Sequence, residues 1–191
     1  VLSEDGNEVS PGTLGAISIK LPLPPGSLPT LWNADGRYKE SYLATFPGYY
    51  ETGDAGYQDE DGYLYIMSRT DDVINVAGHR LSTGAMEEAV SNHTDVAECA
   101  VVGVLDNLKG QVPLGLVCLN NGCNKPDEVI CKEIIDLVRT EIGPVAAFKS
   151  VAVVSALPKT RSGKILRATI RKIADNVDWE MPATVDNPLV F

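Results

Sequence analysis

The chain has 191 residues, of which 44% are hydrophobic and 22% charged, and its formal net charge is −10. This length and composition are typical of one globular domain, or of a small domain plus part of another, and they exclude wholesale disorder. The negative charge argues against nucleic acid and anionic membranes as partners, because both require a basic surface. No apolar run is long enough to span a bilayer.

The cysteines show no paired spacing of the kind that binds zinc. They are Cys99, Cys118, Cys123 and Cys131. Reduced thiols are the simplest interpretation, which fits the cytoplasm or the mitochondrial matrix. The chain begins at Val1 without a visible targeting segment, so we expect it to be a fragment of a longer protein.

The first part of the chain, residues 1–70, is predicted to be β-rich. Strands are expected at Thr13–Lys20, Gly48–Asp54 and Gly62–Met67. No helix of convincing periodicity is expected here, and the segment has the character of an edge piece of a larger domain.

From residue 71 to residue 191, strand and helix patterns alternate, which predicts a compact α/β (α+β) domain. Strands are expected at Val73–Val76, Cys99–Val104, Gly115–Leu119 and Ser150–Ala156. One helix is expected with Thr83 as its N-cap, and others are expected over Asp127–Ile142 and from near Ser162.

Six basic residues and no acidic one lie between Lys159 and Lys172. If Ser162 caps the last helix, Lys164 lies in its first turn, where a cation opposes the helix dipole by a few tenths to about 1 kcal/mol. We therefore expect an anionic ligand near Lys164. The alternative is a solvated lysine on a loop.

Three segments resemble motifs of adenylate-forming enzymes of the acyl-CoA synthetase type, in the expected order. Tyr50-Glu-Thr-Gly-Asp54 resembles the nucleotide-binding motif, Arg69-Thr-Asp-Asp-Val-Ile-Asn-Val-Ala-Gly-His-Arg80 the hinge with its following loop, and Pro158-Lys-Thr-Arg-Ser-Gly-Lys164 the terminal signature. The resemblance runs from about Gly12 to the end of the last helix. It implies that residues 1–70 end a large N-terminal domain, and that residues 71–191 form the small mobile C-terminal domain.

The implied activity is ATP-dependent ligation of a short-chain carboxylate to coenzyme A. Carboxylate and ATP first give an acyl-adenylate and pyrophosphate; the coenzyme A thiol then releases AMP. Ala77, Thr70, Ile142–Phe148 and Asp186–Pro188 resemble the propionate-activating branch more than the acetate-activating one. A non-catalytic nucleotide- or coenzyme A-binding module of the same fold stays open. The loop that cradles the ATP phosphates in relatives is absent from these residues, so the chain alone is not expected to complete adenylation.

The resemblance assigns the nucleotide to Asp54, Arg69 and Arg80. Asp54 would accept hydrogen bonds from the ribose hydroxyls, Arg69 would hold the ribose or the adenylate, and Arg80 would contact a phosphate. Asp54 as a turn residue and Arg69 as a surface residue are the alternatives. Lys164 would be catalytic in the first half-reaction, neutralising charge that develops at the α-phosphate, and would matter little in the second. Lysine acylation and deacylation enzymes acting on Lys164 would then be regulatory partners.

The remaining assignments concern movement, coenzyme A and Mg²⁺. Asp71 would be the hinge, although Asp also suits an ordinary turn. Ala77 and Gly78 would line the pantetheine tunnel. Arg139 would touch a coenzyme A phosphate, or would simply complement the end of its helix. Some relatives bind magnesium through backbone carbonyls of the loop that holds Ser91, His93 and Val96, but a lone histidine is more often an ordinary loop residue, so no metal ligand is assigned.

Overall fold

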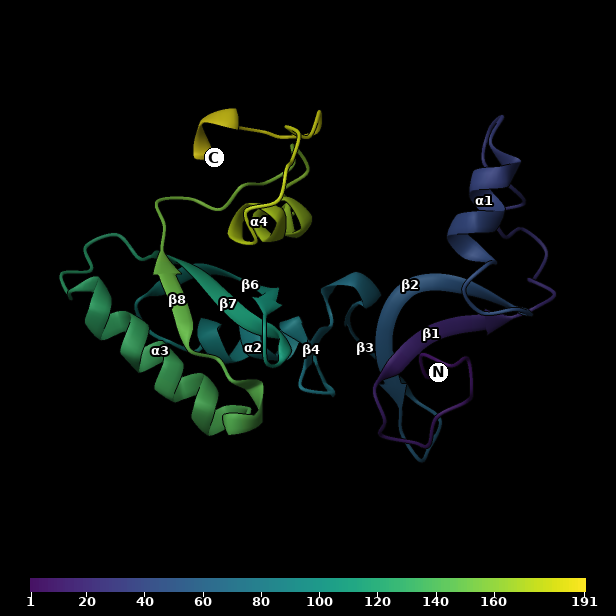
Figure 1. Ribbon diagram of the computed structural model, residues 1–191, viewed down its shortest axis with the longest axis horizontal. Helices are drawn as coiled ribbons and strands as arrows, with labels where there is room; N and C mark the ends of the chain where they lie inside the picture. The colour runs from purple at the N-terminus through teal and green to yellow at the C-terminus, as the bar shows by residue number, and fades with distance from the viewer. The chain divides into compact units, whose positions relative to one another are not determined.

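The computed structural model describes residues 1–191, which divide into two compact units, Val1–Asp71 and Asp72–Phe191 (Figure 1). The second unit combines helices with a mainly antiparallel sheet, as the α/β (α+β) prediction for residues 71–191 requires, and the first unit is built on an antiparallel sheet, as its β-rich prediction requires. No helix combines the length and the apolar character that crossing a membrane would demand.

The first unit is built on a three-stranded antiparallel sheet in the order β1-β2-β3. Its strands are β1 (Gly15–Lys20), β2 (Tyr49–Gln58) and β3 (Leu64–Arg69). A small core of Leu2, Ala16 and Phe46 lies against it, with the half-buried Tyr49 packed on its edge. The three strands lie within a few residues of the expected ones.

The first unit also holds a helix that the sequence did not predict, α1 (Asp35–Tyr42). Tyr38 is its one buried residue, and the Tyr38 hydroxyl donates to the carbonyl of Leu28 at 2.9 Å. The ring of Tyr42 stacks on Tyr50 with centroids 5.2 Å apart. Tyrosine contacts hold this helix, and there is no apolar stripe for periodicity to detect.

The second unit contains a five-stranded sheet in which four strands follow the order β5-β4-β7-β6. The fifth strand, β8, pairs with β7 on the same edge as β4 but further along the strand. Its strands are β4 (Ile74–Val76), β5 (His79–Leu81), β6 (Val96–Asp106), β7 (Gly110–Leu119) and β8 (Ser150–Val153). All pairings are antiparallel except β7 with β8. A parallel pair needs a crossover, and the chain supplies it between Leu119 and Ser150.

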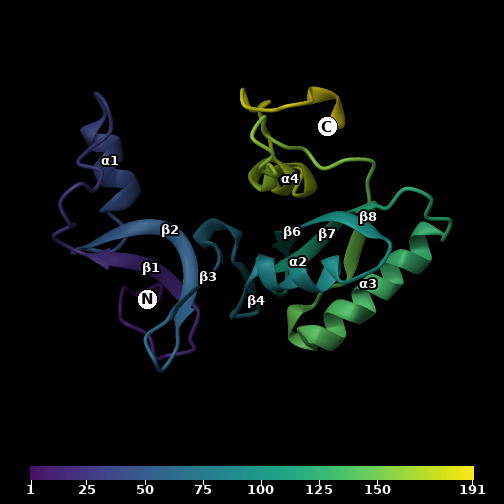
Figure 2. The ribbon, with the colours of Figure 1, turned by 180° about the vertical axis from the view of Figure 1, so that it is seen from behind.

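Three α-helices cover this sheet: α2 (Thr83–Ser91), α3 (Asp127–Glu141) and α4 (Arg167–Ala174). Both ribbon views show α2 and α3 on one face and α4 on the other (Figures 1 and 2). Short 3₁₀ helices span Thr70–Asp72, Pro144–Ala146 and Pro188–Val190.

The main core lies between the sheet and the pair α2–α3. Ile130, Ile134 and Val138 of α3 are fully buried there, at the helical spacing that the sequence displays. A smaller cluster of Ala100, Cys118 and Leu157 lies on the opposite face of the sheet. Neighbouring residues of β6 and β7 thus enter different cores, as strand geometry requires.

Two helix starts differ from the sequence prediction. Ser82, one residue before Thr83, caps α2, and its Oγ accepts the N–H of Ala85 at 3.3 Å. The last helix starts at Arg167, several residues after Ser162. Gly163 has φ +82°, a left-handed conformation that a helix cannot continue, so Ser162 belongs to a turn and does not cap the helix.

Candidate functional site

The nucleotide-binding motif lies in the middle of β2, beside the end of β3. Asp54 and Arg69 are directly paired in the antiparallel register, and Nη1 of Arg69 lies 3.3 Å from Oδ1 of Asp54. Both side chains are partly exposed, at 34% for Asp54 and 57% for Arg69. A carboxylate that accepts hydrogen bonds thus lies beside a guanidinium that donates them, which suits a ligand with both hydroxyls and phosphates.

The Thr-Gly-Asp order has a physical reason in this geometry. Thr52 Oγ1 donates to the carbonyl of Ile17 at 2.7 Å and accepts the N–H of Asp54 at 3.2 Å, which fixes the strand. A Cβ on Gly53 would lie 2.4 Å from Nη2 of Arg69, and Gly53 also has φ +79°. Only glycine allows the guanidinium to lie across the backbone here.

Asp71 is a second carboxylate beside Arg69, in addition to Asp54. Its Oδ1 lies 3.7 Å from Nε of Arg69, and it belongs to the 3₁₀ helix Thr70–Asp72, the segment in which one unit ends and the next begins. Thr70 Oγ1 donates to the carbonyl of Gly53 at 3.1 Å. Arg69 is therefore linked to a carboxylate on each side.

Ala77 and Gly78 form the two-residue turn between β4 and β5, where Val76 pairs with His79. Both have positive φ, +49° and +88°, which is the geometry of a type I′ hairpin turn. Asn75 Oδ1 accepts the N–H of Gly78 at 3.0 Å. A Cβ on Gly78 would meet nothing within 4 Å, so the space beside this turn is open.

Arg80 follows the turn on β5 and is half-buried, paired in register with Asn75. Arg139 is exposed in the last turn of α3. This place also fits the alternative interpretation of Arg139, because a cation there stabilises the negative end of the helix dipole.

Lys164 lies on a tight hairpin. The prediction that it lies in the first turn of a helix is wrong, because α4 begins only at Arg167. Lys159 and Ile165 form an antiparallel bridge, and the N–H of Thr160 donates to the carbonyl of Lys164 at 2.8 Å. The prediction of an anion near Lys164 therefore loses its basis in the helix dipole, because Lys164 is not part of a helix. The exposed Lys164 side chain lines a hollow of about 250 Å³ with Thr160, Arg161, Ser162 and Thr184.

The proposed metal-binding loop lies between α2 and β6. Ser91 ends the helix, Val96 begins the strand, and the carbonyl of His93 accepts the N–H of Val96 at 3.1 Å. The His93 ring packs inside, with Nε2 3.0 Å from Oε2 of Glu133 and Nδ1 accepting the N–H of Asp95 at 3.2 Å. These hydrogen bonds indicate the Nε2-protonated tautomer.

The ammonium group of Lys125 lies within the cluster of acidic residues beside His93. His93, Asp95 and Glu133 have ligand atoms within 4.8 Å of one another, but Nζ of Lys125 lies 2.8 Å from Asp95 and 3.0 Å from Glu133. Its hydrogen bond holds the pKa of Asp95 below the usual value, and the pKa of Glu133 is lowered by Lys125 and then by His93. The side chains of this cluster therefore do not fit a magnesium ion.

Two ion pairs that the sequence analysis did not identify attach the two ends of the hairpin of Lys164 to β6 and to α2. Lys159 Nζ lies 2.6 Å from Oε1 of Glu98 on β6. Arg167 forms a bidentate pair with Glu87 of α2, with Nη2 2.8 Å from both carboxylate oxygens. The members of each pair are 61 and 80 residues apart in the chain, so no local pattern could reveal them.

Residues 85–164 match the family model of the AMP-binding enzyme C-terminal domain. The match lies within the second unit and agrees with the family that the terminal signature resembles. An uncharacterised protein of Pseudomonas aeruginosa is 57% identical over the whole chain, which covers 30% of that relative. The mouse protein named acyl-CoA synthetase short-chain family member 3, mitochondrial, is 50% identical over the whole chain, which covers 28% of it.

Acetyl-coenzyme A synthetase 2 of Eremothecium gossypii is 45% identical over 188 residues, which amount to 27% of its length. The chain thus spans less than a third of each of these relatives. Among solved structures, the amide bond synthetase McbA from Marinactinospora thermotolerans has a TM-score of 0.75 and 27% identity, covering 91% of this chain and 34% of that one. The chain's homologues are short-chain acyl-CoA synthetases and other adenylate-forming ligases.

Proposed function

We propose that the chain is the C-terminal part of a ligase that joins a short-chain carboxylate to coenzyme A through an acyl-adenylate, with propionate as the preferred acid. The observation that carries this proposal is the arrangement of Asp54 and Arg69 around Gly53. A paired acceptor and donor at 3.3 Å suit the ribose and phosphate of an adenylate, and glycine is required where the arginine crosses the strand. The 50% identity of the chain to a relative named as a short-chain acyl-CoA synthetase supports the same reaction.

The residues divide between two half-reactions. Asp54, Arg69 and Arg80 hold the nucleotide in both. Lys164 stabilises negative charge as the carboxylate attacks the α-phosphate and pyrophosphate leaves. The Ala77–Gly78 turn lies along the path of the pantetheine arm, with Arg139 at a coenzyme A phosphate, and Asp71 is the pivot about which the small domain turns between the steps.

ATP, coenzyme A and Mg²⁺ are the proposed cosubstrates and cofactor, and Mg²⁺ would neutralise charge on the ATP phosphates. No step is assigned to a protein-bound metal, because Lys125 occupies the cluster beside His93. Mitochondrial names among the relatives support the mitochondrial matrix, and a bacterial relative supports the cytoplasm. Enzymes that acylate and deacylate Lys164 are the proposed regulatory partners.

The test is acid-dependent pyrophosphate exchange by the full-length protein, with acetate, propionate and butyrate compared. The proposal expects exchange with short acids and the largest kcat/KM for propionate. Acetate is the second candidate, because a relative named acetyl-coenzyme A synthetase 2 is 45% identical to the chain over the 188 residues that align. Absence of exchange with every acid, together with retained binding of AMP or coenzyme A, would mean a non-catalytic binding module.

A further inference from the structure

The hairpin that carries Lys164 is closed by its own backbone but is very short. The N–H of Leu166 donates to Pro158 at 2.9 Å, and the N–H of Gly163 donates to Thr160 at 2.8 Å across the turn. The N–H of Lys164 itself is held by Thr160 Oγ1 at 3.1 Å. A two-stranded hairpin is at best marginally stable in water, so this geometry needs further support.

The C-terminal tail supplies a third strand to this hairpin. Thr160 and Val185 form an antiparallel bridge, in which the N–H of Arg161 donates to Thr184 at 3.0 Å and the N–H of Asp186 donates to Lys159 at 2.9 Å. Residues 184–186 are therefore the edge strand of a miniature sheet whose opposite strand begins at Lys164. Thr184 also lines the hollow around Lys164, so the tail shapes the surroundings of that side chain.

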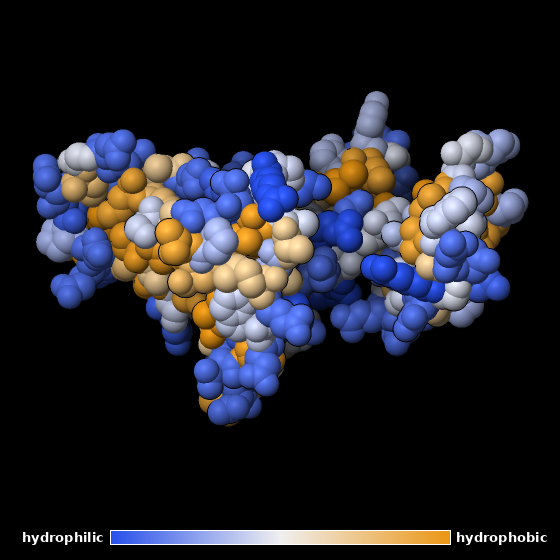
Figure 3. Space-filling view, turned by 90° about the horizontal axis from the view of Figure 1, so that it is seen from above, coloured by the Kyte–Doolittle hydropathy of each residue, from blue (hydrophilic) through white to orange (hydrophobic).

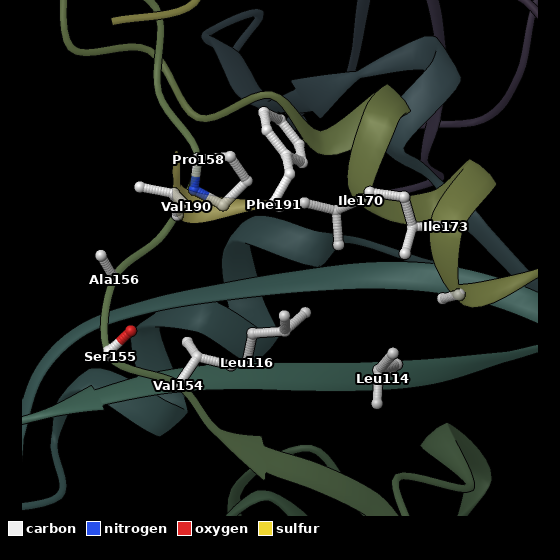
Figure 4. Close-up of a pocket in the computed structure, with 11 residues that line it drawn as sticks. Leu114, Leu116, Val154, Ser155, Ala156, Pro158, Ile170, Ile173, Val190 and Phe191 are labelled. Carbon is white, nitrogen blue, oxygen red and sulfur yellow. The ribbon is translucent and has the colours of Figure 1, made fainter. Parts of the chain in front are cut away.

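The tail is anchored on both sides of this strand. Val185 is 7% exposed. Beyond it, Val190 and Phe191 line an apolar cavity of about 450 Å³ together with Pro158 and Ile170, as Figure 4 shows. The ring of Phe191 lies 4.9 Å from that of Trp179, which precedes the strand.

Other apolar side chains of α4 and the tail remain at the surface. Figure 3 shows apolar side chains reaching the surface on this side of the second unit, and those of α4 and the tail that are exposed include Ile173, Val177, Met181 and Leu189. Val185 is not among the residues of the main core, and the backbone bonds beside it join the hairpin of Lys164. A change in the tail should therefore affect this hairpin before it affects the domain as a whole.

We propose that residues 184–186 are a positioning strand for Lys164, which holds its hairpin in the geometry that adenylation requires. This inference rests on the proposed function, because it assigns the strand to the half-reaction that uses Lys164. A charge that is misplaced by an ångström loses much of its effect on a transition state, whereas attack by a thiol on a preformed adenylate does not depend on it.

The test uses Asp186→Pro in the full-length protein, which removes the N–H that donates to Lys159, and Asp186→Ala as the matched control that keeps it. Val185→Asp is a second, independent way to detach the strand, since it places a charge at a buried position. Hydrogen exchange is followed at the amides of Gly163 and Lys164. Adenylation and thioester formation from supplied acyl-adenylate are measured separately, with the Tm as the control for global stability.

Asp186→Pro and Val185→Asp are expected to speed exchange at Gly163 and Lys164 by about tenfold or more, while Asp186→Ala does not. Adenylation kcat should fall by about 10–100-fold with KM for ATP within about twofold, and the thioester step should persist. Unchanged exchange at both amides would refute the strand, whatever the activity. Faster exchange with normal adenylation, or equal loss in both steps, would refute the positioning role. A parent protein that lacks adenylation altogether fails the proposed function, while the exchange measurement still decides whether the strand holds the hairpin.

Discussion

Arg167 binds both carboxylate oxygens of Glu87, and Oε1 of the same carboxylate accepts the N–H of Val101 at 2.9 Å. The Arg167 and Glu87 side chains are mostly buried, at 27% and 19% exposed. One residue of α2 thereby holds both the beginning of α4 and the middle of β6. Because Arg167 begins the helix directly after the hairpin of Lys164, this pair fixes the C-terminal side of that hairpin.

Glu87→Gln is therefore expected to lower the free energy of unfolding by about 1–3 kcal/mol, since it leaves a partly buried guanidinium without its charged partner. Glu88→Gln is the matched control, because Glu88 is the exposed neighbour on the same helix. Denaturant titration of the two variants measures the difference. Equal stabilities would show that the pair contributes nothing net.

Lys164→Ala in the full-length protein is expected to lower adenylation by about 10²–10³-fold, the usual effect of removing one transition-state charge contact. Thioester formation from supplied acyl-adenylate should survive. Pyrophosphate exchange and a coenzyme A-dependent assay measure the two steps. Arg161→Ala is a useful comparison, because Arg161 is a second cation lining the same hollow. Loss of both steps together would contradict the division of labour.

The turn geometry decides how the coenzyme A path should be tested. Gly78→Leu and Gly78→Ala both place a side chain at φ +88°, so each carries a backbone cost of about 1 kcal/mol that obscures any steric effect. Gly78→Asn avoids most of that cost, because Asn tolerates the left-handed region. If pantetheine passes here, Gly78→Asn should keep a normal Tm and normal pyrophosphate exchange.

The same variant should form acyl-CoA at least about tenfold more slowly, because the nucleophile is displaced. Gly78→Ala should instead lower the Tm with a smaller effect on acyl-CoA formation. A Gly78→Asn enzyme that makes acyl-CoA at the normal rate would exclude this turn from the coenzyme A path.

Lys125 predicts a pH dependence of stability. Its hydrogen bonds depress the native pKa values of Asp95 and Glu133. Depressed carboxylate pKa values stabilise the fold fully above the unfolded values of about 4, and this contribution is lost as pH falls through the native values. Lys125→Met should therefore reduce the fall in Tm between pH 7 and pH 3. Lys132→Met, at an exposed lysine of α3, is the control. Parallel Tm profiles for Lys125→Met and the parent protein would contradict the assignment.

Features that depend on the apolar spacing of a segment were predictable, whereas those that depend on side-chain contacts or on the backbone conformation of a turn were not. The buried stripe of α3 follows from the spacing of its apolar residues, and the Thr-Gly-Asp motif of β2 was identified by its resemblance to a family motif. The helix α1 was missed because tyrosine contacts, and no apolar period, hold it in place. The start of α4 was misplaced because Ser162 is a good N-cap by type, while Gly163 at positive φ ends any helix there.

The pairing of β7 has a mechanical consequence for the second unit. The edge of β7 that faces away from β6 pairs with β4 at Gly110 and with β8 from Leu114 to Val117. The β4 side leads directly to the Ala77–Gly78 turn, and the β8 side leads into the hairpin of Lys164. Both features are thus connected, through β4 and β8, to the same edge of β7. If the proposed cycle uses the two features in turn, we therefore expect rotation of the whole unit to exchange them, because both are connected to the same strand.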